Sequence, residues 1–361
     1  MPTAPPLPQT PPAATGPASS ALARPRAARR VFLGCLLYMS GLTLVWLFFA
    51  VTGRDGGLFF RVYRIDAATV ARILSGFLFF WIGWGWLWYW LKRLLLRRVA
   101  RFSPEELAES FASRIGTPFE LRELLARHSE RRIRIVDMIT RRGRTSPLLL
   151  AGFVYLYFHI SRTPGAQSLA MGIQDNWLDS VVLAAAMLGA YHSSGFFGRA
   201  LYGAHARVMD GRLARANCLV AATMWMQFKF VMIPVGLRLA GVFPADTYAA
   251  LFVFIWMSYI VADTLSEVVG SLLGKQKLRV WGVGEVNRKS VAGTWACFLG
   301  SLAVCLAVVV ARQLPPSWLA LAVVVSVANT ALELFSPRST DDFTMATANA
   351  LLCWGFGALV Y

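Results

Sequence analysis

The sequence is poor in the residues that build cysteine or histidine sites. It has five cysteines and four histidines in 361 residues. The cysteines lie in or beside apolar runs without Cys-x-x-Cys spacing, and the histidines show no spacing typical of metal ligands. Neither a disulfide framework nor a zinc site is therefore indicated. We expect small core residues at Cys35, Cys218, Cys297, Cys305 and Cys353.

Several familiar motifs are also missing. The sequence contains no GxxxxGK[ST] phosphate loop and no HRD and DFG pair, which disfavours the mechanisms of soluble kinases. No repeat with a period of about 20 to 50 residues is visible. This favours neither a solenoid nor a transporter built from inverted repeats.

Acidic residues are scarce, with 19 Asp and Glu against 36 Lys and Arg, which gives a net charge of +17. The basic residues lie mostly in loops beside apolar runs. Membrane orientation and anionic lipid headgroups explain that placement more simply than a nucleic-acid partner does, so we expect no nucleic-acid binding.

Apolar residues are abundant, at 57% of the chain. Runs such as residues 31–51 and 73–91 approach the length that crosses a hydrocarbon core of about 30 Å. The sequence predicts an all-α fold, a polytopic transmembrane bundle of about nine helices. The expected spans are 31–52, 72–91, 147–160, 177–192, 217–241, 247–263, 291–311, 317–335 and 345–361.

The first 91 residues divide into two parts. Residues 1–30 are rich in Pro and Ala and contain no acidic residue, which is typical of a disordered tail; an organelle transit peptide is the alternative. Residues 31–91 hold the first two expected helices, and basic residues flank them at both outer ends. The positive-inside rule then predicts a cytoplasmic N-terminus.

Residues 92–146 are polar and rich in arginine. The stretch SPEE, residues 103–106, is a capping box in which Ser103 begins a helix and Glu106 reaches back to it. We predict a cytoplasmic amphipathic helical segment, with partner binding as the less favoured alternative. Residues 147–361 form the remaining transmembrane bundle, and their candidate motifs fall within residues 255–345.

Three polar stretches converge on the cytoplasmic face when the spans alternate. In the first, Asp263 and Glu267 lie four residues apart, so both carboxylates project from one helical face and could hold Mg²⁺. Capping or solvation of the helix end is the alternative for this pair. Gly270 and Gly274 continue nearly the same face, and a phosphate can approach them closely. Helix packing is the plainer explanation of this glycine pair.

The second stretch, RKSVAGT at residues 288–294, precedes an expected helix with cations and hydroxyl groups. A helix N-terminus with such neighbours favours an anion, although lysines beside a span often serve only as positive-inside anchors. The third stretch follows Glu333, a carboxylate near the membrane, where an unpaired charge is costly. Gln227 and Lys229 form another possible intramembrane polar site, and a snorkelling lysine is the alternative.

These stretches resemble the membrane-bound dolichol, phytol and polyprenol kinase family, which includes CTP-dependent lipid kinases. The resemblance covers roughly residues 255–361. It rests on D-T-L-x-E-x-x-G at 263–270, G-K at 274–275, R-K-S-x-x-G-T at 288–294 and E-L-x-S-P-R-x-x-D-D at 333–342. The family usually has Asp-Asn at the last two positions of that final motif.

The resemblance implies an integral membrane kinase that transfers a phosphoryl group from CTP or another nucleotide, with nucleotide-bound Mg²⁺, to the hydroxyl group of an isoprenoid or lipid alcohol such as polyprenol, dolichol or phytol. A CTP-using cytidylyltransferase that makes a CDP-lipid, and a transporter or scaffold without chemistry, are the alternatives. The implied catalytic carboxylates are Asp263, Glu267, Glu333 and Asp341, with Asp263, Glu267 and Asp342 as metal ligands. The implied nucleotide- and phosphate-binding residues are Gly270, Gly274, Lys275, Arg288, Lys289, Ser290, Gly293 and Thr294.

Overall fold

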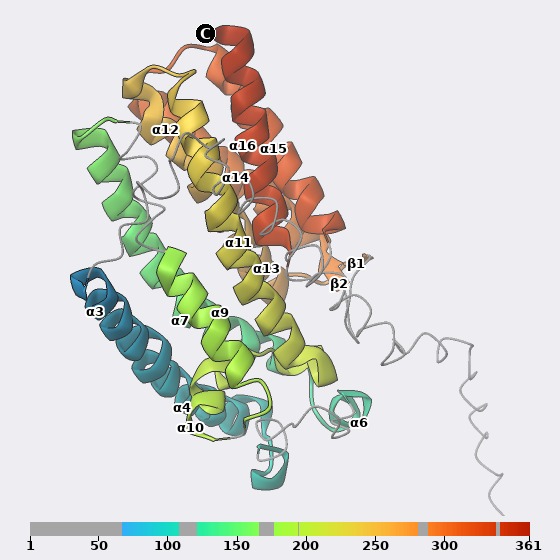
Figure 1. The fold of residues 1–361 in the computed structure, drawn as a ribbon. Helices are drawn as coiled ribbons and strands as arrows, with labels where there is room; N and C mark the ends of the chain where they lie inside the picture. The colour runs from blue at the N-terminus through green and yellow to red at the C-terminus, as the bar shows by residue number, and fades with distance from the viewer. Residues whose placement is uncertain (1–66, 108–120, 166–176, 194, 281–287, 337–339) are drawn as a thin grey trace, which may run out of the picture.

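The computed structural model describes residues 67–107, 121–165, 177–193, 195–280, 288–336 and 340–361 (Figure 1). The described chain is mostly helical and contains one short antiparallel pair of strands. The predicted tail, residues 1–30, and the first expected span, residues 31–52, lie outside the described residues. In chain order the elements are α3 (Ala67–Gly76), η1 (Phe77–Gly83), α4 (Trp84–Leu95), η2 (Leu96–Ala100), α6 (Leu121–Arg127), α7 (Glu130–Arg162), α9 (Trp177–Gly189), α10 (Phe196–Gly198), η3 (Arg199–Gly203), η4 (Val208–Leu213), α11 (Ala214–Ala240), η5 (Ala245–Thr247), α12 (Tyr248–Phe252), η6 (Val253–Met257), α13 (Ser258–Leu272), β1 (Lys277–Arg279), β2 (Arg288–Ser290), α14 (Val291–Ala311), α15 (Ser317–Phe335) and α16 (Asp341–Val360).

Five helical stretches of the described chain are long and apolar enough to cross a membrane. Large apolar side chains stand exposed on several of them, for example Phe79, Val310 and Leu359. Exposed apolar surface of this kind is typical of a lipid-facing helix. The predicted class is thus confirmed as a mostly helical protein with candidate spans, and the count of nine stays a prediction. The five stretches are Val70–Ala100, Ala245–Leu272, Val291–Ala311, Ser317–Phe335 and Asp341–Val360.

The other expected spans fall in helices of different character. The range 147–160 is the second half of α7, whose 33 residues begin with a strongly basic half. The range 177–192 overlaps α9, which has 13 residues and is short for a bilayer that needs about 20. The range 217–241 overlaps α11, which has 27 residues.

The C-terminal helices α13, α14, α15 and α16 pack side by side around one apolar core (Figure 1). Tyr259, Cys297, Trp318 and Cys353 from these four helices are fully buried in it. Because the buried cysteines are free thiols, their expected role as small core residues is confirmed for the described ones.

A polar contact inside this core fixes the four helices against one another. The Asn329 amide of α15 donates to Ser301 of α14 at 2.9 Å and to Ser258 of α13 at 3.3 Å. The Asn349 amide of α16 donates to the same Ser258 hydroxyl at 3.2 Å. Such hydrogen bonds between helices set their register in a membrane. Glu333 lies one turn after Asn329, so its position is set as well.

The segment at 92–146 packs more deeply than a helix lying on a membrane surface. Its capping box is confirmed, since the Ser103 amide donates to Glu106 at 2.9 Å and the Glu106 amide to the Ser103 hydroxyl at 3.2 Å. Ile133 and Val136 of α7 are fully buried in a second core with parts of η2, α6 and η4. That packing brings the next turns of α7 against α13.

Strands β1 and β2 form the one departure from an all-helical chain among the described residues. They pair antiparallel, with Lys277 opposite Ser290 and Leu278 opposite Lys289. Each strand has three residues, too short to give a recognisable alternation in the sequence. The pair leads the chain into the first turn of α14.

Candidate functional site

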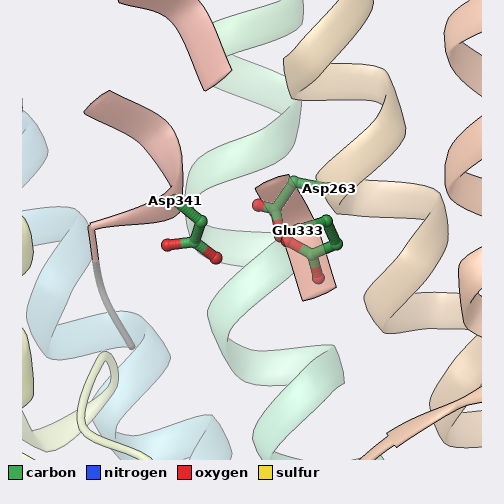
Figure 2. A group of neighbouring side chains, drawn as sticks. All are labelled: Asp263, Glu333 and Asp341. Carbon is green, nitrogen blue, oxygen red and sulfur yellow. The ribbon is translucent and has the colours of Figure 1, made fainter. Parts of the chain in front are cut away.

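Three carboxylates from three helices meet at one place (Figure 2). Asp263 belongs to α13, Glu333 lies in the last turn of α15, and Asp341 is the first residue of α16. Each offers an oxygen atom that lies within 4.8 Å of the other two. Asp263 and Glu333 are buried, and Asp341 is partly buried. We call these three residues the carboxylate cluster.

Only one of the two carboxylate oxygens of Glu333 has hydrogen-bond partners among the described residues. Its Oε1 atom accepts from the Lys289 ammonium and, at 3.1 Å, from the Ser266 hydroxyl. Its buried Oε2 atom has no hydrogen-bond partner among the described residues. Burial acts against the charge of Lys289, but the carboxylates of Glu333 and Asp341 outweigh it and raise the Lys289 pKa. Lys289 therefore stays charged.

The carboxylate cluster fits a divalent cation such as Mg²⁺. Carboxylate oxygens are its preferred protein ligands, and one oxygen of each of the three residues lies within 4.8 Å of the other two, close enough for one cation to contact all three. The unpartnered Glu333 oxygen supports the fit. The carboxylate cluster contains one of the predicted metal ligands, Asp263. Another predicted ligand, Asp342, directly follows Asp341 in the first turn of α16.

Glu267, the other predicted metal ligand, is surrounded by arginines. Arg141 Nη1 lies 3.3 and 3.2 Å from its two oxygens, and Arg207 Nη2 lies 3.0 Å from Oε1. Arg142 donates to Glu267 through Nε and to Asp263 through Nη2, at 2.5 Å for the latter. Burial opposes the Arg142 charge, but Asp263 and Glu267 outweigh it and raise its pKa. We call Arg141, Arg142 and Arg207 the arginine cluster.

The arginine cluster was not predicted from the sequence. Arg141 and Arg142 stand directly before the apolar range 147–160, where positive-inside anchoring accounts for them. The spacing of apolar residues in α7 does indicate that this part of the helix is buried in the protein. Ile133 and Val136 are spaced as on a buried helix face, and Arg141 and Arg142 follow within two turns.

The start of α14 lies tightly against α13. The Ser290 hydroxyl accepts from the Gly293 amide at 3.1 Å and so caps the helix, and the Thr294 hydroxyl donates to the Ser290 carbonyl at 3.1 Å. A Cβ atom on Gly270 would lie 2.9 Å from Ser290 Oγ, and one on Gly293 would lie 2.8 Å from the Ser266 carbonyl. Close helix packing thus accounts for both glycines, and their role in phosphate binding stays a prediction.

The remaining predicted residues are spread more widely. Gly274 follows the end of α13 and packs against Ser290. Lys275 is exposed, whereas Lys277 of β1 lines the cavity of the site. Three predicted residues have side chains outside the described part of the structure: Arg288 in β2, and Gln227 and Lys229 in α11.

One polar cavity joins the two clusters. Its wall includes Asp263, Glu333 and Asp341 at the carboxylate cluster and Arg141 and Arg207 at the arginine cluster. It also includes residues of α7, of the chain before α11, and of the strand pair. A site with both fixed cations and carboxylates suits a ligand that is itself an anion bound to a metal.

Comparison of the chain with protein-family models, with curated proteins and with solved structures finds no match.

Proposed function

We propose that this chain is an integral membrane kinase that transfers a phosphoryl group from a nucleotide to the hydroxyl group of a lipid alcohol. The observation that carries the proposal is the meeting of Asp263, Glu333 and Asp341 beside Lys289. The resemblance of the motifs supplies CTP as the donor and an isoprenoid alcohol such as polyprenol, dolichol or phytol as the acceptor. The N-terminus and the catalytic loops would then be cytoplasmic.

The reaction needs charge neutralisation and positioning more than covalent chemistry. The oxygen of the alcohol forms a bond to the γ-phosphorus, the bond between that phosphorus and the β–γ bridging oxygen breaks, and the nucleoside diphosphate leaves. The proton of the alcohol passes to a carboxylate oxygen of the carboxylate cluster. Bound Mg²⁺ supplies positive charge to the triphosphate oxygens.

Lys289 brings the second fixed charge to the same place. It is held by Glu333 and lines the cavity, so its ammonium can contact a phosphate without a large movement. Ser290 keeps it there, because this residue both ends β2 and caps α14. A pre-positioned cation of this kind stabilises the charge that develops on the transferred phosphoryl group.

The position of the site suits a lipid acceptor. Asp263 and Glu333 belong to helices apolar enough to cross a membrane, and Asp341 begins a third. An isoprenoid chain can remain among the helices and lipids while its hydroxyl group reaches the carboxylate cluster. A soluble acceptor would not require this placement.

The test uses the purified full-length chain in neutral lipid nanodiscs with Mg²⁺. Labelled CTP or ATP is offered with a panel of polyprenol, dolichol, phytol and diacylglycerol, and both products are identified. We expect one alcohol to gain phosphate while the nucleoside diphosphate is released. Asp263→Asn should abolish the transfer, and Asp246→Asn, an exposed carboxylate at the other end of the same candidate span, should not.

Two results would contradict the proposal. Release of pyrophosphate with a CDP-lipid would assign the chain as a cytidylyltransferase. If the protein is folded and binds nucleotide but phosphorylates no alcohol, a transport or scaffold role would remain instead.

A further inference from the structure

The arginine cluster has more hydrogen-bond donors than its acidic partners can use. A guanidinium carries five N–H donors. Among the described residues, Arg141 donates only through Nη1, to the Glu267 carboxylate, and Arg207 contacts that same carboxylate through Nη2. The other donors of these two side chains have no described protein partner. Both residues line the cavity, with side chains 18% and 26% exposed.

A further arginine stands on the same wall of the cavity. Arg134 precedes Arg141 by two turns of α7, and its Nε atom lies 2.7 Å from Glu130 Oε1. Its buried Nη2 atom has no hydrogen-bond partner among the described residues. A buried donor left without an acceptor is costly, so this atom is a second indication that the wall receives an acceptor from outside the chain.

Glu267 holds the arginine cluster together. Three guanidinium groups converge on its single carboxylate, and Arg142 divides its donors between Glu267 and Asp263. The Glu267 carboxylate lies between these guanidinium groups and reduces their mutual repulsion. An incoming anion can take over the spare donors without moving the helices, because the donors already face one cavity.

We propose that Arg134, Arg141 and Arg207 form a binding subsite for the polyphosphate group of the donor nucleotide, on the side of Glu267 that faces the cavity. The planar fork of arginine matches phosphate oxygens in pairs, which a single lysine cannot do. The subsite belongs to α7 and the chain before α11, so the N-terminal half of the chain contributes to donor binding. The identity of the anion as a nucleotide polyphosphate rests on the proposed function.

Binding of an inorganic probe tests the subsite without any lipid substrate. The full-length protein in phosphatidylcholine nanodiscs is titrated with tripolyphosphate, and the dissociation constant is measured by calorimetry. We expect Arg141→Gln and Arg207→Gln each to weaken binding about tenfold or more, because each removes charge-assisted hydrogen bonds. Arg132→Gln, an exposed arginine on the same helix, is the matched control and should bind as the unaltered protein does.

Two further arms make the outcome decisive. Arg141→Lys keeps the charge and loses the fork, so it should fold like the unaltered protein and still bind tripolyphosphate more weakly. Nanodiscs with phosphatidic acid separate a lipid headgroup from a free polyphosphate. Arginine-dependent binding of phosphatidic acid without binding of tripolyphosphate would overturn the proposal.

Failure of this inference is distinguishable from failure of the proposed function. If the protein phosphorylates an alcohol while Arg141→Gln and Arg207→Gln leave both tripolyphosphate affinity and the KM for nucleotide unchanged, the subsite is refuted and the kinase stands. If tripolyphosphate binding depends on these arginines but no alcohol is phosphorylated, the anion subsite stands and the kinase is refuted.

Discussion

The Arg142 guanidinium of α7 lies 2.5 Å from the Asp263 carboxylate of α13, and 121 residues separate the two in the sequence. The same guanidinium also donates to Glu267, one turn further along α13. Arg142 therefore ties the N-terminal half of the chain to the helix that carries the first carboxylate of the cluster. It is a positioning residue for Asp263 as well as a source of positive charge.

Replacement of Arg142 by Gln should destabilise the protein strongly. Two carboxylates would lose a buried partner, and breaking a buried ion pair from one side costs about 3–5 kcal/mol. The free energy of unfolding, measured by denaturant titration in detergent micelles, should fall by about that amount. Arg162→Gln, an exposed arginine at the end of α7, should change it by less than about 0.5 kcal/mol.

A double-mutant cycle separates this pair from a general effect of the substitution. Arg142→Gln combined with Asp263→Asn should cost less than the sum of the two single changes, because the pair is already broken by either one. Strict additivity would mean that the contact between Arg142 and Asp263 contributes nothing to stability.

The three members of the carboxylate cluster should respond alike to amide substitution. Asp263→Asn, Glu333→Gln and Asp341→Asn each remove one negative ligand, and we expect phosphoryl transfer to fall by about 100-fold or more in each. The measurement is the initial rate with CTP and the preferred alcohol across a Mg²⁺ titration. A weaker metal ligand should raise the Mg²⁺ concentration needed for half-maximal rate.

The exposed carboxylate variant Asp246→Asn is the control for this series. It should keep the rate and the Mg²⁺ dependence of the unaltered protein. A normal rate in Glu333→Gln would remove Glu333 from the site and leave its unpartnered oxygen without an explanation.

The sequence predicted the C-terminal helices well because their apolar runs are long and bounded by turns. The expected ranges 291–311 and 317–335 coincide with α14 and α15. The alternation of spans also brought Asp263 and Glu333 to one end of the bundle. Helical spacing, however, predicts only that Asp263 and Glu267 share one helix face. It does not predict that Glu267 is surrounded by arginines.

The parts of the candidate site that the sequence did not predict depend on contacts between distant segments. Arg142 and Arg207 reach Glu267 because α7 packs against α13, and no local pattern encodes that packing. Membrane-anchoring arginines and site arginines have the same local sequence, since both stand beside an apolar run. Asp341 enters the cluster because α16 begins beside the end of α15; the alternation of spans predicted the shared face but not the contact.

The pair of Lys92 and Asp137 should be a strong stabilising contact; it belongs to neither the carboxylate cluster nor the arginine cluster, although Asp137 lines the same cavity. Lys92 Nζ lies 3.0 Å from Asp137 Oδ1, and their side chains are 1% and 4% exposed. Asp137 also accepts from the amides of Val208 and Met209, both at 3.1 Å, which holds the start of η4. Lys92→Met should lower the free energy of unfolding by about 3–5 kcal/mol, because it leaves a buried carboxylate without its cation.

Thermal unfolding in detergent micelles gives the comparison for this pair. Lys275→Met, at an exposed lysine, should leave the Tm nearly unchanged. Lys92→Met with Asp137→Asn should recover part of the loss, since the uncompensated charge is then removed. An unchanged Tm in Lys92→Met would show that this ion pair is not a stabilising contact.

His205 should make the protein less stable as the pH falls. Burial of its ring, together with the positive charges of Arg144, Lys92 and Arg142, lowers the pKa of His205 to about 3. The unfolded chain binds a proton at this histidine at about pH 6.5, and the folded chain does not. The contribution of neutral His205 to the free energy of unfolding is therefore fully present above that pH and is lost as the pH falls below it. The loss is about 1.4 kcal/mol for each pH unit between about 6.5 and 3.

The free energy of unfolding, measured from pH 7.5 to 5, should therefore change less with pH in His205→Asn than in the unaltered protein. The control is His192→Asn, at an exposed histidine, which should keep the full pH dependence. Equal slopes for His205→Asn and the unaltered protein would mean that His205 takes up its proton as readily in the folded chain as in the unfolded one.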